Sequence, residues 1–425
     1  MRKPVSLIAG AAILGLALAG CSGGGDTPSD SGGANEVEVF TWWSSGSEKV
    51  GLDALVKVFN EQYPDIEFIN ASVAGGAGSN AKAALASRLE AGDPPDTFQA
   101  HAGAELTDYI EAGQLQDLSS FFDDEGFTEV FPESLIQLLT VDDAIYSVPS
   151  NIHRANVVWV NTGILENAGI DPKKAPADID AWISDLEKVK ASGVEGPLAL
   201  GTEWTQMQLF ETVLLADLGA DGYTGLWTGD TSWDSDGVTT AIDHYSTLLD
   251  FVNSDYTGLD WDAATQILID GQAAYNVMGD WAEAAFAQAG LTYDNEYTTW
   301  PVPGTEGIFD FLADSFTLPV GAPHEEPAKD WLRTVGSADG QQAFNLAKGS
   351  IPARTDIDAA DYPPYQQTAI KAYADDVIVS SLAHGAAASI AWSGDISSAV
   401  GRFGSDKDVA ALQSALVDAA QKALG

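Results

Sequence analysis

Apolar positions change repeatedly between a spacing of two and a spacing of three to four along the chain, beginning at Val37. The segment VEVFTWW, residues 37–43, combines alternating valines with aromatic residues, a composition that favours a strand. Leucine, valine and phenylalanine then recur at helical spacing over 47–63. The same pattern predicts strands over 65–73 and 96–103 and helices over 79–91 and 104–112. Strand and helix in regular alternation predict an α/β fold with a doubly wound parallel sheet.

The second half of the chain continues the pattern after a polar segment. PSNIHRAN, residues 149–156, has no helical spacing and is a candidate crossover to a second lobe. The expected strands here are 144–148, 156–161 and 273–279, and the expected helices are 178–192, 205–218, 238–251 and 408–424. The apolar run 308–319 is interrupted by Asp314, whose carboxylate needs partners if it is buried. A chain of 425 residues is long enough for two domains.

The first 36 residues predict an export signal and a tether. A basic start precedes an apolar run over 5–20, which is too short for a comfortable membrane span, so we expect residues 1–20 to be a signal peptide. The run ends in LAGC, which resembles the lipobox of bacterial lipoproteins and implies cleavage before Cys21 and a lipid anchor on its thiol. Residues 21–36 are rich in Gly, Ser and Asp, as flexible linkers are. Because Cys21 is the only cysteine, no disulfide is expected.

The charge of the chain is strongly negative. There are 63 Asp and Glu residues against 19 Lys and Arg, a net charge of −44. Such a surface repels phosphate backbones and anionic lipid heads, which argues against binding to nucleic acid or to a membrane surface. We interpret the charge as a solvated surface, and the lipid is then the one expected membrane attachment.

Chemically useful side chains gather where the expected strands end. Trp42 and Trp43 close the first strand, Gln99 and His101 close the third, and Glu48 follows the tryptophans. In an open α/β sheet the carboxyl ends of the strands face the ligand crevice. Neighbouring side chains on a strand point to opposite faces, so one indole is expected to pack and the other to face the crevice. The alternative is that both indoles lie in the core.

No catalytic motif is present in the sequence. There is no GxSxG, no HExxH and no cysteine nucleophile, and the histidines show no metal-ligand spacing. The abundant acids leave a glycosidase pair of carboxylates open. Tryptophan beside carboxylate, amide, imidazole and ammonium groups suits a neutral sugar, because an indole face covers the C–H face of a pyranose while the polar groups bind hydroxyls. The alternative for each residue is an ordinary core or surface place, and no metal or cofactor is expected.

Several motifs, in this order along the chain, resemble the glucose/mannose-binding proteins of bacterial ABC importers, within the family 1 extracellular solute-binding proteins. They are VFTWW, VAGGAGSNAKA, GDPPDTFQAHAG, SVPSNIHRANV, PLALGTEWTQ, AAYNVMGDWA, ADSFTLP, FNLAKGSI and SLAHGA. The resemblance implies a two-lobe periplasmic-binding-protein-like fold of type II, with a ligand cleft between lobes joined by hinge crossovers. The N-lobe is expected to comprise 37–152 and 317–354, and the C-lobe 153–316 and 355–425. The implied crossovers lie near 150–154, 314–317 and 351–356.

The resemblance also implies which residues contact the ligand. Carried over by matching position, they are Trp42, Trp43, Glu48, Gln99, His101, Trp261, Trp281, Asp314, Lys348 and His384. The turn after Trp43 is one residue longer than the family pattern, which affects the placement of Glu48. Asp314 is expected from the second lobe, together with Trp261 and Trp281. Among the remaining histidines, His153 is expected at the hinge, and His244 and His324 at the surface.

The function implied is that of a monomeric receptor, lipid-anchored to the outer face of the bacterial cell membrane. It would capture an aldohexose such as glucose, mannose or galactose and deliver it to the permease subunits of an ABC transporter. It is not expected to be an enzyme. Two alternatives remain open at this point, which are the same receptor for a di- or oligosaccharide and a surface glycoside hydrolase.

Overall fold

The computed structural model describes residues 35–75 and 78–425. The expected signal peptide, the anchor Cys21 and the linker up to residue 34 lie outside the described residues. Within the described part of the chain, no helix is long and apolar enough to span a bilayer.

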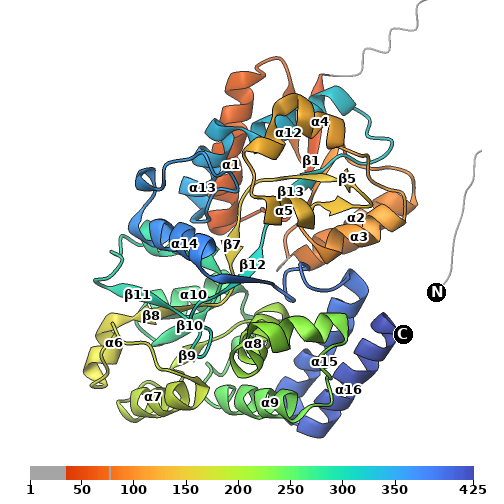
Figure 1. Cartoon of the computed structure of the whole chain (residues 1–425). Helices are drawn as coiled ribbons and strands as arrows, with labels where there is room; N and C mark the ends of the chain where they lie inside the picture. Colours follow the sequence, from red (N-terminus) through yellow and green to blue (C-terminus); the bar gives the residue numbers. More distant parts are fainter. Residues whose placement is uncertain (1–34, 76–77) are drawn as a thin grey trace, which may run out of the picture. The chain divides into compact units, whose positions relative to one another are not determined.

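The first sheet has five strands, in the order β2-β1-β3-β13-β6. Their bounds are β1 Glu36–Phe40, β2 Glu67–Asn70, β3 Thr97–His101, β6 Ser147–Pro149 and β13 Asp314–Thr317. β1 pairs in parallel with β2 and β3, while β13 runs antiparallel to β3 and β6. Five helices of the N-terminal part and two that follow β13 are α1 Gly46–Gln62, α2 Ser79–Glu90, α3 Ala104–Glu111, α4 Ser119–Glu125, α5 Glu133–Leu138, α12 Glu325–Gly336 and α13 Ala338–Lys348. Figure 1 shows α1 beside α13, and α12 contacts β1.

A second sheet has the order β11-β8-β10-β9, and a third has the order β14-β12-β7. Their strands are β7 His153–Arg154, β8 Val157–Asn161, β9 Leu198–Ala199, β10 Tyr275–Val277, β11 Tyr297–Pro301, β12 Ile308–Leu312 and β14 Val377–Ser380; β4 Thr140–Val141 and β5 Ala144–Ile145 form a separate hairpin. The helices are α6 Thr162–Asn167, α7 Ile179–Ala191, α8 Glu203–Thr228, α9 Asp236–Leu248, α10 Trp261–Ile269, α11 Glu283–Gln288, α14 Pro364–Asp375, α15 Ile390–Asp406 and α16 Val409–Leu424. In Figure 1 the C-terminal α15 and α16 lie beside α8 and α9, far from them in sequence.

The buried apolar side chains form two hydrophobic clusters, one of which extends from the first lobe into the second. In α1 the buried side chains include Leu52, Leu55 and Phe59, which recur on one face. This face belongs to a cluster that also includes Trp331. A separate cluster fills the second lobe, where Tyr245 is fully buried. The α/β, two-lobe architecture predicted from the sequence is confirmed, but the expectation of a purely parallel sheet is wrong, because β13 enters the first sheet antiparallel to its neighbours.

Two expected strands end or divide earlier than the sequence indicates. β1 stops at Phe40, and the two tryptophans follow it in a loop. The Thr41 hydroxyl, directly after β1, donates to Gln99 Oε1 and accepts from Trp43 N at 3.2 Å. The expected strand 144–148 is divided between β5 and β6.

The apolar run 308–319 forms two strands in different sheets. β12 pairs with β14 and β7, whereas β13 pairs with β3 and β6. The chain therefore changes sheet at Ala313. The expectation that Asp314 comes from the second lobe is wrong, because Asp314 opens β13 opposite His101 in the first sheet.

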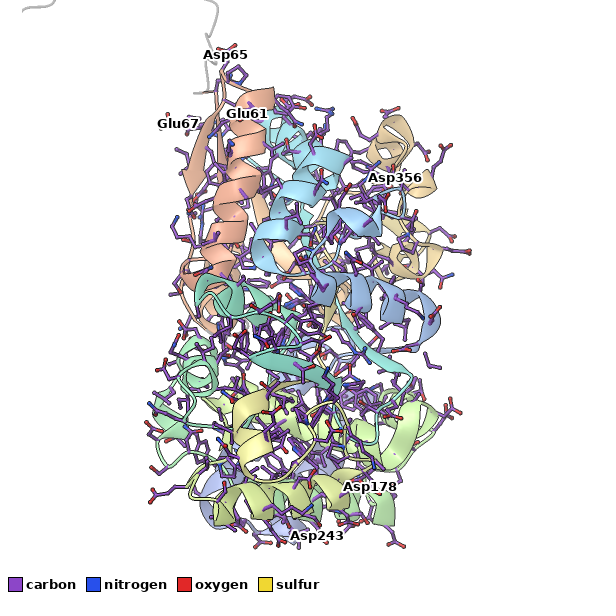
Figure 2. All side chains as sticks on the ribbon, turned by 90° about the vertical axis from the view of Figure 1, so that its left-hand side faces the viewer. Glu61, Asp65, Glu67, Asp178, Asp243 and Asp356 are labelled. Atoms are coloured by element: carbon purple, nitrogen blue, oxygen red, sulfur yellow. The ribbon has the colours of Figure 1, made fainter. Side chains whose placement is uncertain are left out.

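The negative charge lies on the outside of the molecule. Figure 2 labels six exposed carboxylates whose side chains point away from the ribbon, and these are Glu61, Asp65, Glu67, Asp178, Asp243 and Asp356. Exposed carboxylates keep contact with water, so as a group they contribute mainly to solubility.

Candidate functional site

A cavity of about 600 Å³, part of it open to solvent, collects side chains from both lobes. Eight of the ten residues expected at the site line it, namely Trp42, Glu48, His101, Trp261, Trp281, Asp314, Lys348 and His384. Trp43 and Gln99 are not among the lining residues. Residues not assigned to the site from the sequence also line it, including His153, Trp204 and Asp260.

The two adjacent tryptophans after β1 have different surroundings. Trp42 lines the cavity, with its ring centroid 4.9 Å from that of His101. A Cβ on Gly78 would lie 2.8 Å from this indole, so glycine lets the backbone approach the ring. Trp43 is fully buried instead, and the Nζ atom of Lys348 lies 4.3 Å from its ring centroid. Trp43 therefore supports the cavity wall by holding Lys348 through a cation–π contact.

Asp314 is the centre of a buried hydrogen-bond network. Its Oδ1 accepts from Gln99 Nε2 at 2.8 Å, and its Oδ2 accepts from Asn151 Nδ2 at 2.8 Å and from Lys348 Nζ at 3.0 Å. Burial works to raise the pKa of Asp314, but Lys348 and His153 outweigh it and hold the pKa well below its ordinary range. Gln99 thus acts behind the cavity, where it holds the carboxylate of Asp314.

Glu48 presents a carboxyl group to the cavity without a protein partner. It lies in the first turn of α1, where the helix dipole favours an acid. The residue is half-buried, and its side chain has no hydrogen bond to any other described residue. Burial raises its pKa to about 7, while the nearby Lys348 works against that rise. Glu48 therefore changes protonation near neutral pH and is free to bond a ligand.

A Glu48→Gln variant is expected to be more stable than the parent at about pH 8, by about 2 kcal/mol. The folded-state pKa of about 7 exceeds the ordinary value of 4.5. The contribution of this group to stability is therefore fully present below its ordinary pKa of 4.5 and is lost as the pH rises through the folded-state pKa of about 7. At about pH 4 the carboxyl is protonated in both states, so the gap should close.

Thermal melts of both proteins at the two pH values measure this gap. Glu61→Gln removes an exposed carboxyl from the same helix and is the control, which should not change the melting temperature at either pH. A stabilisation by Glu48→Gln that is equal at both pH values would contradict the buried, titrating carboxyl.

Two further histidines of the cavity are held by buried carboxylates. His101 Nδ1 lies 2.8 Å from Glu105 Oε2. Burial opposes ionisation of Glu105, but Lys82 and His101 lower its pKa to about 2. His153 on β7 bonds Asp280 through Nδ1, and Asp280 raises the pKa of His153 against the effect of burial. The expected hinge residue His153 is therefore also a wall of the cavity.

The second lobe contributes an aromatic wall. Trp281 stands with its ring centroid 5.1 Å from that of His384 and 6.3 Å from that of Trp204. Asp260 caps α10 by accepting from Trp261 N at 2.8 Å, and it also accepts from Trp204 Nε1 at 3.1 Å. One carboxylate thus positions two indoles. In the sequence, Trp204 lies one residue before the expected helix 205–218 and within the motif PLALGTEWTQ, and neither position distinguishes a site residue from a core residue.

The remaining histidines lie away from the cavity. His244 and His324 are partly buried rather than at the open surface. His244 bonds Asp217 at 2.9 Å, and His324 bonds Asp96 at 3.1 Å. Over residues 35–75 and 78–425, no three His, Cys, Asp or Glu side chains are grouped as metal ligands. The cavity therefore offers indole faces and hydrogen-bonding groups, a combination that fits a small neutral ligand with an apolar face and several hydroxyls.

Comparison with known proteins shows the same kind of fold and sequence. Residues 43–342 match the profile of the family described as bacterial extracellular solute-binding protein. An uncharacterized ABC transporter extracellular-binding protein of Pyrococcus horikoshii is 35% identical over 98% of this chain and 96% of its own length. A probable sugar-binding periplasmic protein of Brucella melitensis is 32% identical over 82% of this chain and 83% of its own.

Two solved structures share the fold at lower identity. A chitin oligosaccharide binding protein superposes with a TM-score of 0.79 at 20% identity, covering 92% of this chain and 98% of its own. A bacterial solute receptor with an exclusive substrate preference for β-D-galactopyranose superposes with a TM-score of 0.78 at 19% identity, covering 92% of this chain and 100% of its own.

Proposed function

We propose that this chain, which belongs to the bacterial extracellular solute-binding protein family, captures a monosaccharide and delivers it to the permease of an ABC importer. Membership of the family implies an extracytoplasmic location. The observation that carries the proposal is a cavity that joins indole faces to polar groups with unused bonding capacity. Glu48 and His384 Nε2 have no hydrogen-bond partner among the described residues, and Lys348 Nζ has one, Asp314.

These groups fit an aldohexose such as glucose, mannose or galactose. Trp42 and Trp281 can cover the C–H faces of a pyranose, since indole is apolar on its faces. Glu48, Lys348 and His384 can bind its hydroxyls, and bonds to the charged groups are the stronger ones. The sugar-binding name of the Brucella relative and the galactopyranose preference of the structural neighbour support this ligand class.

Isothermal calorimetry of the mature chain with D-glucose, D-mannose and D-galactose tests the proposal. One of them should bind with a dissociation constant of about 10 μM or lower, and L-glucose is the matched control. Lys348→Met should weaken that binding by about 10–100-fold, because an ammonium bond to a buried hydroxyl is lost. If none of the three sugars produces heat or raises the melting temperature, the monosaccharide proposal fails.

The two lobes are proposed to close over the sugar. Their expected bounds are 37–152 with 317–354 and 153–316 with 355–425, except that all of β13 belongs to the first lobe. Two of the crossovers run side by side, because Ile152 and Ile351 exchange backbone hydrogen bonds of 2.8 and 3.1 Å. A short paired hinge of this kind permits rigid-body closure. The protein, expected to be a monomer in solution, should therefore show a smaller radius of gyration when the sugar that it binds is added.

A second candidate ligand is a di- or oligosaccharide. Trp204 lines the main cavity and also a neighbouring, more apolar cavity between α2, α3, α8 and α15, which includes Tyr109 and Met207. A longer sugar could extend across Trp204 from one cavity to the other. Maltose and cellobiose in the same titration decide between the two ligands, since tighter binding than any monosaccharide would favour the longer one.

One feature favours the hydrolase alternative. The carboxyl group of Glu48, whose pKa is raised, lies in the same cavity as the carboxylate of Asp314, whose pKa is lowered. Both oxygens of Asp314 are already engaged by Gln99, Asn151 and Lys348, so this carboxylate is not free to act as a nucleophile or base. We therefore favour a receptor without catalytic activity. Steady release of the aryl group from aryl glycosides would overturn this choice.

Cys21→Ser is expected to release the protein from the membrane. The LAGC segment supports a lipid on Cys21, and no other attachment is proposed. Washed membranes and supernatant of cells producing each form are compared by immunoblot. Retention of the serine variant in the membrane fraction would contradict the lipid anchor.

A further inference from the structure

The imidazole of His384 presents one nitrogen to the cavity side and the other to a serine. Nδ1 lies 2.8 Å from Ser381 Oγ, while Nε2 is buried without a hydrogen-bond partner within the described residues. In a neutral imidazole one nitrogen donates and the other accepts. The tautomer therefore decides whether the cavity offers a donor or an acceptor at this position.

The ring of His384 stays neutral in these surroundings. Burial lowers its pKa well below the usual range, and the positive character of His101, His153 and Lys82 lowers it further, although Asp314 works in the opposite direction. The side chain is 3% exposed, so solvent does not relieve this effect. The neutral ring carries a single proton, on either Nδ1 or Nε2.

Ser381 is oriented by a carboxylate behind it. Its Oγ lies 2.9 Å from Oε1 and 3.2 Å from Oε2 of Glu211, and Glu211 Oε2 also accepts from Ala383 N at 2.8 Å. An ionised carboxylate only accepts hydrogen bonds, so the Ser381 hydroxyl donates to it. The oxygen lone pair of Ser381 then accepts from Nδ1–H of His384, which leaves the lone pair of His384 on Nε2.

Asp310 keeps Glu211 in the accepting state. Both carboxyls are fully buried and interact, and two like charges at such a place do not both ionise. Burial raises the pKa of Glu211 to about 7, but Ala383 N–H and the Ser381 hydroxyl hold it down. Burial and Glu211 both raise the pKa of Asp310, well above its ordinary range. Asp310 is therefore the carboxyl that keeps its proton, and Glu211 is the one that ionises.

We infer that Glu211 and Ser381 are positioning residues that hold His384 in its Nδ1–H tautomer, so that the cavity accepts a hydrogen bond through Nε2 from a ligand hydroxyl. The tautomer is a property of the ligand-free protein. The consequence for selectivity rests on the proposed sugar ligand: the hydroxyl that faces His384 must donate, so a fluorine at that carbon is rejected. Glu211 lies 173 residues from His384 and does not line the cavity.

Imidazole ¹⁵N NMR of the ligand-free mature chain at about pH 7.5 tests the tautomer directly. The spectrum of His384, assigned by its loss in His384→Gln, should show a protonated Nδ1 and an unprotonated Nε2. Glu211→Gln should move the proton to Nε2. Its amide oxygen would accept from Ala383 N, so its NH₂ would donate to Ser381 and turn the hydroxyl toward Nδ1.

Ser381→Ala is the milder variant and should leave a mixture of the two tautomers. Thr212→Val removes another buried hydroxyl from α8, one that donates to Leu209 O at 2.9 Å, and it should leave the His384 spectrum as in the parent. A protonated Nε2 in the parent overturns the inference. So does an unchanged tautomer in both Glu211→Gln and Ser381→Ala, provided that both variants melt cooperatively.

A second arm uses the monodeoxyfluoro series of the sugar that binds. One positional analogue should bind the parent about 10-fold more weakly than the sugar itself, because fluorine cannot donate to Nε2. In Glu211→Gln, where Nε2 donates, the affinity for the same analogue should be less than about 3-fold below that for the sugar.

If no sugar binds but the tautomer is as expected, the proposed function fails and the positioning role stands. If a sugar binds and Glu211→Gln leaves the fluorine preference unchanged, the positioning role fails and the receptor stands.

Discussion

Asp314→Asn is expected to lower the free energy of unfolding by about 3–5 kcal/mol, because it breaks a buried ion pair from one side only. Lys348 Nζ lies 3.0 Å from the carboxylate, and both side chains are almost fully buried. Gln99 donates to one oxygen of Asp314 and Asn151 to the other, so an asparagine would turn its NH₂ toward a donor in either orientation. The Lys348 ammonium would meanwhile stay buried without its counter-ion.

Asp310→Asn is the matched control. Asp310 is equally buried and lies four residues away, but its raised pKa keeps it protonated, so a neutral amide of the same size can replace it at a cost below about 1 kcal/mol. Adding Lys348→Met to Asp314→Asn should recover at least about half of the loss, because the unpaired charge is removed. Denaturant unfolding at about pH 7 measures all four proteins.

The pH dependence of the Asp314 effect has a defined sign. The pKa of Asp314 is depressed in the folded chain, so its stabilisation is present above its ordinary pKa and is lost as the pH falls through the folded-state value. The gap between the parent and Asp314→Asn should therefore narrow in acid. Equal unfolding free energies for Asp314→Asn and Asp310→Asn at neutral pH would remove Asp314 from the centre of the network.

Gly279→Ala is expected to weaken sugar binding by about 10–100-fold by displacing Trp281. A Cβ on Gly279 would lie 2.1 Å from the indole, so the ring must move. Gly279 has a φ of −63°, which alanine adopts without strain, and the backbone is therefore not the cause of the effect. The moved ring would leave its place edge-on to His153 and His384. Overpacking should also cost about 1–3 kcal/mol of stability.

Calorimetry on a double-mutant cycle shows whether the effect passes through Trp281. In a Trp281→Ala background, Gly279→Ala should cause no further loss of affinity, because there is no ring left to displace. Gly163→Ala is the control, since Gly163 is exposed in α6 and its Cβ would meet only Asn161 Oδ1, at 3.6 Å. Parental affinity in Gly279→Ala would mean that Trp281 does not touch the sugar.

Local periodicity was sufficient for most of the secondary structure. The expected helix 47–63 is α1 Gly46–Gln62, and the expected helix 408–424 is α16 Val409–Leu424. Apolar spacing predicts such elements because each must bury one face, whatever it packs against. The run 308–319 was not resolved by this reasoning, since a strand that changes sheet has the same apolar pattern as one that does not.

The candidate site divides in the same way. Trp42 and His101 were expected at one edge of a sheet because parallel strands bring their carboxyl ends together, and both line the cavity. Trp43 beside Trp42 was expected to contact the ligand, but it lies behind the cavity wall. Its role depends on Lys348, which reaches its ring from the end of α13.

The amino-acid sequence by itself determined where helices and strands form, that the surface is acidic, and that indoles and polar groups gather at strand ends. Those properties depend on neighbours within a few positions, so they can be read locally. Only the tertiary structure decided which lobe holds Asp314, that Gln99 and Lys348 share its carboxylate, and that Glu211 stands behind His384. These contacts join residues 34 to 215 positions apart, and which of the many acids meets which donor is settled by packing, through the cost of leaving a buried polar group unpaired.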